Sequence, residues 1–306
     1  MPVTTPRHRM RISLWLALIT LLLAPSAWAG TSLLERYHQI KSGEAATLPG
    51  TAITLTSAEQ GEVLSAEVSS ILQYPFGKVA AALAQAENWC QFMPLHFNIK
   101  ACTYAPRTGG EVLTLYSGRK YYESPEDSFK MAYRFEILRQ DDAQLSLRLS
   151  ADQGPAGTHD YRIELDALQV EEGTLLHIQS SYKPSMLSSL LTSTYLATLG
   201  RDKVGFSHIE QNGETQLVQG IRGVIERNVM RYQLAVAVFL STQNLPAPSR
   251  REAQMARWFK QNDSYPHQLH EMTKIEYLNS KRREWLDQQR LQEALNERIK
   301  VAATPP

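Results

Sequence analysis

EVLSAEVSSILQYPFGKVAAALAQAENWCQFMPLHFNIKAC, residues 62–102, is the stretch that decides the fold of this chain. Its first part, Glu62–Tyr74, is rich in Val, Ile and Ser in loose alternation, which predicts a strand. Pro75 suits the first turn of a helix, because its missing N–H costs nothing there. A second short helix over Glu87–Met93 ends before Pro94. The order is therefore strand, helix, short helix and strand.

Further strand-like runs follow, separated by turns rich in Gly, Pro and Asp. The expected strands are 96–104, 111–122, 129–139, 143–151, 159–168 and 174–183. Apolar residues occupy every second position between Phe129 and Ile137, so one face of the sheet is expected to be buried and the other wet. Glu214–Gln243 then carries apolar residues at helical spacing over about eight turns.

This order predicts an α+β fold of the helix-grip type, in which a curved antiparallel sheet wraps around a long C-terminal helix. Extra helices are expected over residues 249–262 and 267–300. We expect an N-terminal extension at 30–61, the helix-grip domain at 62–243 and a C-terminal helical extension at 244–306.

With Asn88-Trp89 on the second short helix, the segment YPFGKVAAALAQAENWCQFMP, residues 74–94, and the order of elements resemble the START/SRPBCC (Bet v 1-like) superfamily. The resemblance covers roughly residues 62–243. It implies a cavity for a hydrophobic ligand between sheet and long helix. Members of that superfamily bind lipids, sterols or polyketides, and a few are cyclases or hydrolases.

The N-terminus has the pattern of a secretory signal peptide. Arg7, Arg9 and Arg11 precede the apolar run Ile12–Leu23, and Ala27-Trp28-Ala29 supplies small residues at a cleavage site. We expect cleavage after Ala29 and export to the periplasm. The alternative, an uncleaved anchor, is disfavoured because the apolar run falls short of the ~20 residues that span a bilayer.

Overall charge gives no attraction to nucleic acid. The formal net charge is +1, and loss of the three leader arginines leaves 32 − 3 = 29 basic against 31 acidic residues, a net of −2. A near-neutral chain has no global electrostatic pull toward nucleic acid or anionic lipid.

Cys90 and Cys102 are the two cysteines, and in an oxidising compartment they are expected to form a disulfide. The alternatives are a nucleophilic cysteine and a metal site. We expect no metal and no cofactor, because His267 and His270 are the one pair of histidines at helical spacing and a single pair is a weak signal.

The expected ligand site combines aromatic residues of the strands with a polar cluster on the long helix. Glu226, Arg227 and Arg231 share helical faces, and an arginine there could orient a ligand carboxylate. The alternative for this cluster is a structural ion pair. The aromatic residues expected to line the cavity are Tyr116, Tyr133, Phe135, Tyr161 and Tyr182.

Ser185–Leu199 is an uncharged segment crowded with leucine. It predicts either a helix packed on the sheet edge or an apolar lid that contacts a membrane. No nucleophile-elbow, zincin, Walker A or dinucleotide motif is present. The leading hypothesis is therefore a non-enzymatic periplasmic carrier of a hydrophobic ligand. The alternatives are a cyclase or hydrolase that uses the polar cluster with His96, and an interaction module acting through the C-terminal helices.

Overall fold

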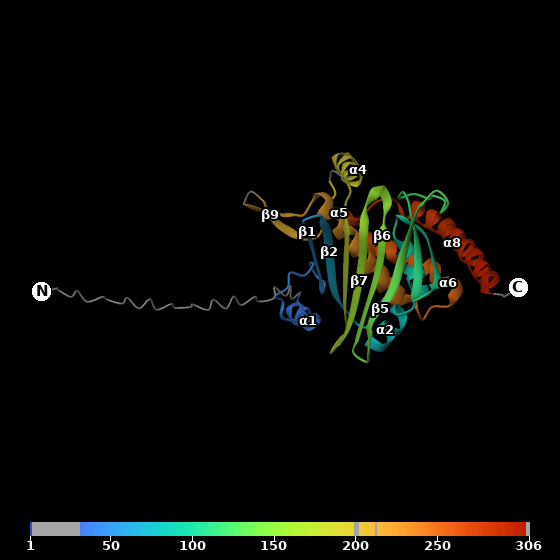
Figure 1. The fold of residues 1–306 in the computed structure, drawn as a ribbon, viewed down its shortest axis with the longest axis horizontal. Coiled ribbons are helices and arrows are strands. Elements are labelled where there is room, and N and C mark those ends of the chain that lie inside the picture. Colours follow the sequence, from blue (N-terminus) through green and yellow to red (C-terminus); the bar gives the residue numbers. More distant parts are fainter. Residues whose placement is uncertain (2–30, 199–201, 212, 304–306) are drawn as a thin grey trace. The chain divides into compact units, whose positions relative to one another are not determined.

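The long helix α5 (Gly220–Thr242) lies across one face of a single antiparallel sheet (Figure 1). This is seen in a computed structural model that describes residue 1 and residues 31–198, 202–211 and 213–303. The chain divides into two units, residues 1–32 and residues 33–306, and the second is described here by itself. Sheet and helix together confirm the predicted α+β helix-grip fold.

Eight strands form the main sheet in the order β1-β2-β8-β7-β6-β5-β4-β3, with every neighbouring pair antiparallel. The sheet is therefore open, with β1 and β3 at its edges. The strands are β1 (Ile53–Gln60), β2 (Val63–Leu72), β3 (Ile99–Arg107), β4 (Gly110–Ser117), β5 (Phe129–Gln140), β6 (Gln144–Gln153), β7 (His159–Val170) and β8 (Gly173–Lys183).

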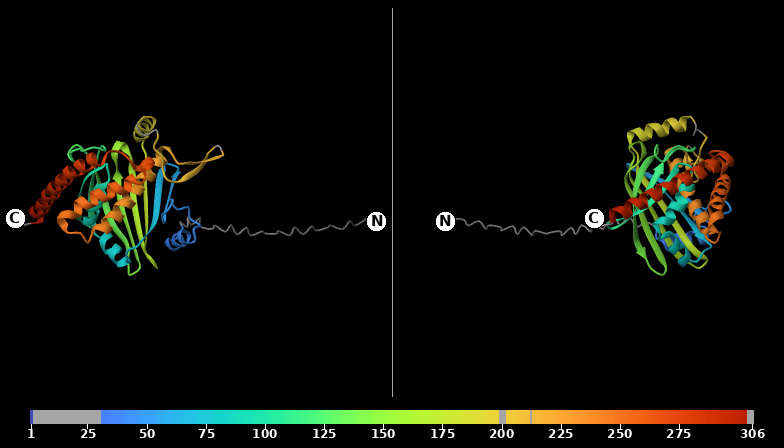
Figure 2. Two further views of the ribbon diagram at one scale, coloured as in Figure 1. Left: turned by 180° about the vertical axis from the view of Figure 1, so that it is seen from behind. Right: turned by 90° about the vertical axis from the view of Figure 1, so that its right-hand side faces the viewer.

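The helices on the inner side of the sheet include α5, α6 and α8, which the left view of Figure 2, taken from behind, shows in front of the strands. Besides α5, the helices of the described residues are α1 (Leu33–Ser42), α2 (Phe76–Leu83), α3 (Ala86–Phe92), η1 (Met93–Leu95), η2 (Pro155–Gly157), α4 (Met186–Ala197), α6 (Ala247–Asp263), α7 (Pro266–Leu269) and α8 (Lys274–Ala303).

Period-2 alternation places one apolar face of the sheet against the helices. The fully buried inner positions of β5, β6 and β7 include Met131, Phe135, Leu147 and Leu165. Gln233 of α5 donates a hydrogen bond from Nε2 to Ser70 Oγ at 2.6 Å. The interface between sheet and α5 is thus filled by apolar side chains and closed by a buried polar contact.

The predicted helix 214–243 begins later than expected. Glu214–Leu217 forms the strand β10, which pairs with β9 (His208–Gln211), and α5 starts at Gly220. Gly220 has a φ of +65°, a backbone conformation that favours glycine and lets the chain turn from strand into helix. At Gly223, an added Cβ would lie 3.2 Å from the backbone nitrogen of Gly205, so the loop before β9 packs directly against the helix.

Residues 30–61 and 244–306, predicted as extensions, lie in the same unit as the sheet from residue 33 onward. The helix α1 covers part of the outer face, where Tyr37 and Ile40 pack on Leu175. The predicted signal peptide, residues 1–29, falls almost wholly outside the described residues. Within the described part of the chain, no helix has both the length and the apolar character needed to span a bilayer.

The free edge of β3 is occupied by glutamines of α8. Gln288 Oε1 accepts the backbone N–H of Cys102 at 2.8 Å, and Gln292 Oε1 accepts that of Tyr104 at 2.9 Å. Four helical residues rise about 6 Å and two strand residues rise about 6.6 Å, so side chains four apart on the helix match every second amide of the strand. The helix α8 is thereby fixed along the sheet.

His177, on the outer face, is expected to make stability depend on pH. Its Nδ1 lies 2.9 Å from Ser69 Oγ, and burial, with Arg36 nearby, lowers its pKa from 6.5 to about 4. Between those values the unfolded chain holds more protons than the folded one, so stability is complete above pH 6.5 and falls as pH drops toward 4. Acidification from pH 7 to 4.5 should therefore cost about 2 kcal/mol through this group.

Denaturant titrations at several pH values test this prediction with His177→Asn. The variant should show a shallower loss of stability below pH 6.5, whereas His208→Asn, at an exposed position on β9, should keep the wild-type slope. Identical slopes for His177→Asn and the wild type would show that this histidine does not contribute.

Candidate ligand-binding site

Tyrosines from three strands gather at one end of the inner face. Tyr161 of β7 stacks on Tyr182 of β8 with ring centroids 5.0 Å apart, and Tyr133 of β5 meets Tyr161 edge-on at 6.5 Å. Tyr232 of α5 completes the group, since the neighbouring phenol of Tyr161 helps to raise the pKa of Tyr232, and Tyr232 helps to raise that of Tyr133. Three of the predicted ligand residues, Tyr133, Tyr161 and Tyr182, are therefore brought together.

The hydroxyls of this tyrosine cluster are largely unoccupied by protein. Tyr161 OH lies 2.9 Å from Thr158 Oγ1. The hydroxyls of Tyr133, Tyr182 and Tyr232 have no hydrogen-bond partner among the described residues, and none of them is a fully enclosed atom. Burial raises the pKa of each of these phenols, so they stay neutral and able to donate. They offer polar contacts in an otherwise apolar surrounding.

The helix α4 stands over this end of the sheet. Ser185 caps its N-terminus in a capping box with Ser188 and also donates from Oγ to Ala156 O at 2.7 Å, in the turn next to Thr158. Near its other end, Tyr195 lies under Lys120 Nζ, 5.0 Å from the ring centroid. The helix is thus held at both ends beside the tyrosine cluster.

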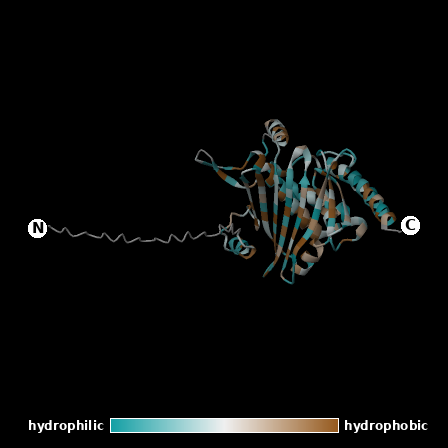
Figure 3. Cartoon of the chain, viewed as in Figure 1, coloured by the Kyte–Doolittle hydropathy of each residue, from teal (hydrophilic) through white to brown (hydrophobic). Residues whose placement is uncertain are grey.

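The large apolar residues of α4, a helix that Figure 3 colours partly brown, are exposed. Four large side chains are more than half exposed, namely Met186 at 91%, Leu187 at 55%, Leu190 at 64% and Leu191 at 53%. The small polar Ser188 is buried, at 8%. This is the reverse of an ordinary surface helix, which turns its apolar stripe inward. Of the two readings of Ser185–Leu199, the exposed apolar element agrees with this arrangement and packing on the sheet edge does not.

The sequence predicts a cavity between sheet and α5. Four cavities that are lined by described residues include no residue of α5. The middle of this interface is packed, because Val229, Met230 and Val236 of α5 are fully buried against the sheet. At the tyrosine end of the interface, Tyr161, Tyr182 and Tyr232 remain partly accessible.

Two of the predicted aromatic residues lie elsewhere. Phe135 is buried and packs edge-on against Trp89 at 6.0 Å, so it belongs to the core. Tyr116 has the opposite pleat direction to Leu115, and Lys130 Nζ lies over its ring at 5.7 Å. Tyr116 therefore points to the outer face, away from the tyrosine cluster.

Glu226 has a structural role. Its carboxylate accepts hydrogen bonds from Ser57 Oγ at 2.6 Å, from the backbone N–H of Phe206 at 2.6 Å, and from the N–H and Oγ of Ser207 at 3.0 and 2.5 Å. Four donors satisfy both oxygens of a fully buried carboxylate. Glu226 thus ties β1 and the 205–207 loop to α5 and has no atom left for a ligand.

The two predicted arginines also hold the chain together. Arg227 donates to Val204 O at 3.2 Å, and Arg231 donates to Glu271 Oε1 at 2.8 Å and to Leu269 O at 3.3 Å. These contacts fix the loop before β9 and the connection between α7 and α8. The polar cluster on α5 matches the alternative of a structural ion pair.

His96, the base of the enzyme hypothesis, is engaged on both ring nitrogens. Nδ1 accepts the N–H of Asn98 at 3.1 Å, so Nε2 carries the hydrogen and faces Asn228 Oδ1 at 3.3 Å. Burial, reinforced by the charge of Arg231, holds its pKa well below the usual range. A neutral imidazole with no free nitrogen is poorly placed for proton transfer.

The cysteine prediction is confirmed, since Cys90 and Cys102 form a disulfide. No group of three or more metal-ligating side chains occurs within the described ranges. Tyr232 was absent from the predicted ligand residues, although its position seven residues after Ile225 places it on the same inward stripe of α5 and could have identified it.

Comparison with known proteins gives fold neighbours alone. No family model and no curated protein matches the chain. Among solved structures, a STAR-related lipid transfer protein from Xanthomonas axonopodis is similar at 17% identity and TM-score 0.36, over 50% of this chain and 89% of that one. The di-domain ARO/CYC StfQ of the steffimycin pathway matches at 12% identity and TM-score 0.37, over 67% and 52%.

CalU16 from Micromonospora echinospora matches at 11% identity and TM-score 0.31, over 68% of this chain and 93% of that one. Because the identities and TM-scores are low, nothing about activity is taken from these neighbours. The helix-grip assignment rests on the strand order and on the position of α5.

Proposed function

We propose that this protein binds lipid, that it meets a lipid layer through α4, and that it holds the polar end of one lipid or acyl chain at the tyrosine cluster. The observation that carries the proposal is the outward apolar face of α4, made of Met186, Leu187, Leu190 and Leu191 in a helix without charge. The expected signal peptide supports a periplasmic location.

Burial of this face gives a sufficient driving force. Complete burial of one large apolar side chain contributes about 1.5–3 kcal/mol, and these side chains already have part of their surface covered. Four of them that gain about half of this value contribute roughly 4 kcal/mol, which is about a thousandfold in partitioning. The attraction is apolar, so it should depend weakly on salt and on lipid charge.

Vesicle flotation tests the proposal with Leu187→Ser/Leu190→Ser. Loss of about 2 kcal/mol should weaken binding to phosphatidylcholine vesicles by roughly 30-fold. The matched control is Ile275→Ser/Leu286→Ser, because these two residues are equally exposed on α8, at 73% and 52%, and should leave binding unchanged. Failure of the wild-type protein to float with vesicles of any composition would overturn the proposal.

Native mass spectrometry of protein recovered from the same vesicles gives the second measurement. The wild type should carry the mass of one lipid. Tyr133→Phe/Tyr182→Phe keeps the rings but removes two unpartnered hydroxyls, and it should lower the lipid-bound fraction while vesicle binding stays intact. Equal occupancy in variant and wild type would show that the tyrosine cluster does not hold the polar end.

A further inference from the structure

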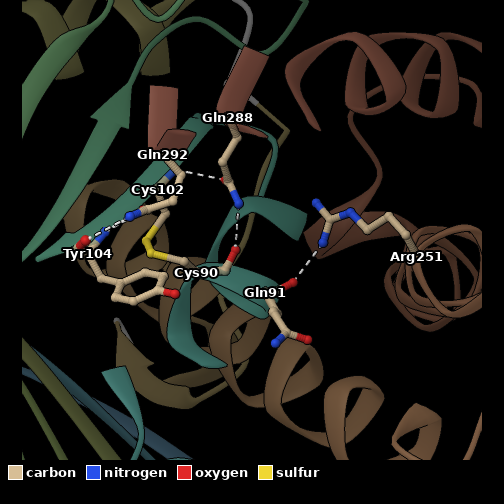
Figure 4. Close-up of a disulfide and its surroundings, with 7 residues drawn as sticks. All are labelled: Cys90, Gln91, Cys102, Tyr104, Arg251, Gln288 and Gln292. Atoms are coloured by element: carbon tan, nitrogen blue, oxygen red, sulfur yellow. Dashed lines mark hydrogen bonds between the residues drawn. A yellow bond between two sulfur atoms is a disulfide. The ribbon is translucent and has the colours of Figure 1, made fainter. Parts of the chain in front are cut away.

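A cavity lies beside the disulfide, away from the tyrosine cluster, between α3, β3, α6 and α8. Its volume is about 310 Å³, at the small end of the range of about 300–1,000 Å³ that ligand pockets occupy. Figure 4 shows Arg251 reaching from α6 toward the segment that carries Cys90 and Gln91, with Gln288 near the disulfide. Gln288 Nε2 donates to Cys90 O at 3.0 Å, so the wall next to the disulfide is rigid.

Arg251 faces this cavity with unused hydrogen-bonding capacity. One terminal nitrogen donates to Gln91 O at 2.7 Å, and the guanidinium lies 4.3 Å from the centroid of the Trp285 ring. Its Nε is buried and has no partner among the described residues. Burial lowers the pKa of Arg251 to about 10, which leaves it charged at neutral pH.

No carboxylate of the described residues forms an ion pair with this guanidinium. The two that influence it from a distance are committed elsewhere, Glu284 to two lysines and Glu252 to Arg282. Arg250, one residue earlier and also lining the cavity, donates to Leu245 O and to no other acceptor within the described part of the chain. A partly buried cation without a counter-ion among the described residues is unfavourable, so the cavity favours an anion.

The remaining lining sets the rest of the ligand's chemistry. Glu87 is the single acidic residue against Arg250 and Arg251, which leaves the lining with a net charge of 2 − 1 = +1. Trp285 and Tyr104 contribute flat apolar walls beside the disulfide. A planar guanidinium binds a carboxylate through two parallel hydrogen bonds, and the aromatic walls suit a flat apolar body.

We propose that this cavity binds a small organic carboxylate with a flat apolar body, whose carboxylate pairs with Arg251 and whose body lies between Trp285 and Tyr104. The site is separate from the tyrosine cluster and from α4, and it does not depend on lipid binding. A single carboxylate matches the single excess positive charge of the lining.

Titration calorimetry of the purified protein with 2-naphthoate and 2-naphthamide tests the proposal. The two probes have the same shape and differ in charge. A ligand of this size is expected to bind with a Kd of about 1 mM, and the amide should bind at least about tenfold more weakly. Arg251→Gln should reduce naphthoate binding to the level of the amide.

Arg257→Gln is the matched control, because Arg257 lies on the same helix but does not line this cavity, and it should keep the preference for the carboxylate. If Arg251→Gln does not fold, Arg250→Gln takes its place and should narrow the difference between the two probes. Equal binding of acid and amide, absence of binding by both, or an unchanged preference in the folded arginine variants would overturn the proposal.

Discussion

Replacement of Glu284 by alanine is expected to lower the free energy of unfolding by about 3–5 kcal/mol. Glu284 accepts Lys100 Nζ at 2.9 Å and Lys281 Nζ at 2.7 Å, and the three side chains are at most 2% exposed. Two ammonium groups thus share one carboxylate inside the protein. Without it, both charges stay buried with only backbone carbonyls as partners.

The pH dependence of this variant follows from the lysines. Burial lowers the pKa of Lys281 to about 8, although Glu284 opposes that shift. A lysine with a depressed folded pKa binds fewer protons when folded, so stability rises with pH between the folded and unfolded values. Removal of Glu284 lowers the lysine pKa further, so Glu284→Ala should recover part of its lost stability as pH rises toward 8, because the unpaired lysines become neutral.

Chemical denaturation at pH 7 with two comparison variants isolates the effect of burial. Glu252→Ala breaks the ion pair between Glu252 and Arg282. Because these two side chains are about half exposed, at 51% and 48%, the variant should lose about 0–1 kcal/mol of unfolding free energy. Lys100→Met/Lys281→Met/Glu284→Met removes all three charges and should be more stable than Glu284→Ala. A Glu284→Ala protein as stable as Glu252→Ala would contradict the assignment.

Removal of the disulfide is expected to cost about 3 kcal/mol of unfolding free energy. Cys90 and Cys102 are 12 residues apart, and their bond joins α3 to β3 across η1. The bond limits the conformations of this loop in the unfolded chain. The loop also carries Phe92, Leu95 and Phe97, which are buried in the core.

Unfolding of wild type and Cys90→Ala/Cys102→Ala, each with and without reductant, measures this contribution. The wild type should lose stability on reduction, whereas the double variant should be indifferent to reductant and close to the reduced wild type. Equal stability of oxidised and reduced wild type would show that the cross-link adds nothing.

Local sequence patterns were sufficient to predict most of the sheet and the helices. The alternation over residues 129–137 placed β5 and its buried face correctly, and Pro75 marked the start of α2. The disulfide prediction follows from two cysteines in a chain that is expected to be exported. These features depend on residues that are close in sequence, where periodicity and turn chemistry act directly.

The polar architecture was not predictable in the same way. Lys100 and Glu284 are 184 residues apart, and Ser57 and Glu226 are 169 apart, so no local pattern links them. For residues 226–231 the helix pattern shows only that they share a face, which is compatible both with ligand contacts and with a structural ion pair. Their actual partners come from the loops 204–207 and 269–271, which the helix pattern does not reveal.

The glutamines along β3 also bear on how copies of this chain behave toward one another. An unpaired outer strand presents amides that can template addition of a strand from a neighbouring molecule, the first step toward fibrils. Gln288 and Gln292 occupy the amides of Cys102 and Tyr104, and Gln292 also reaches the carbonyl of Tyr104 at 3.0 Å. The helix α8 therefore protects the edge of β3 from pairing with another copy of the chain. A chain truncated before α8 would expose this edge and should be prone to aggregation.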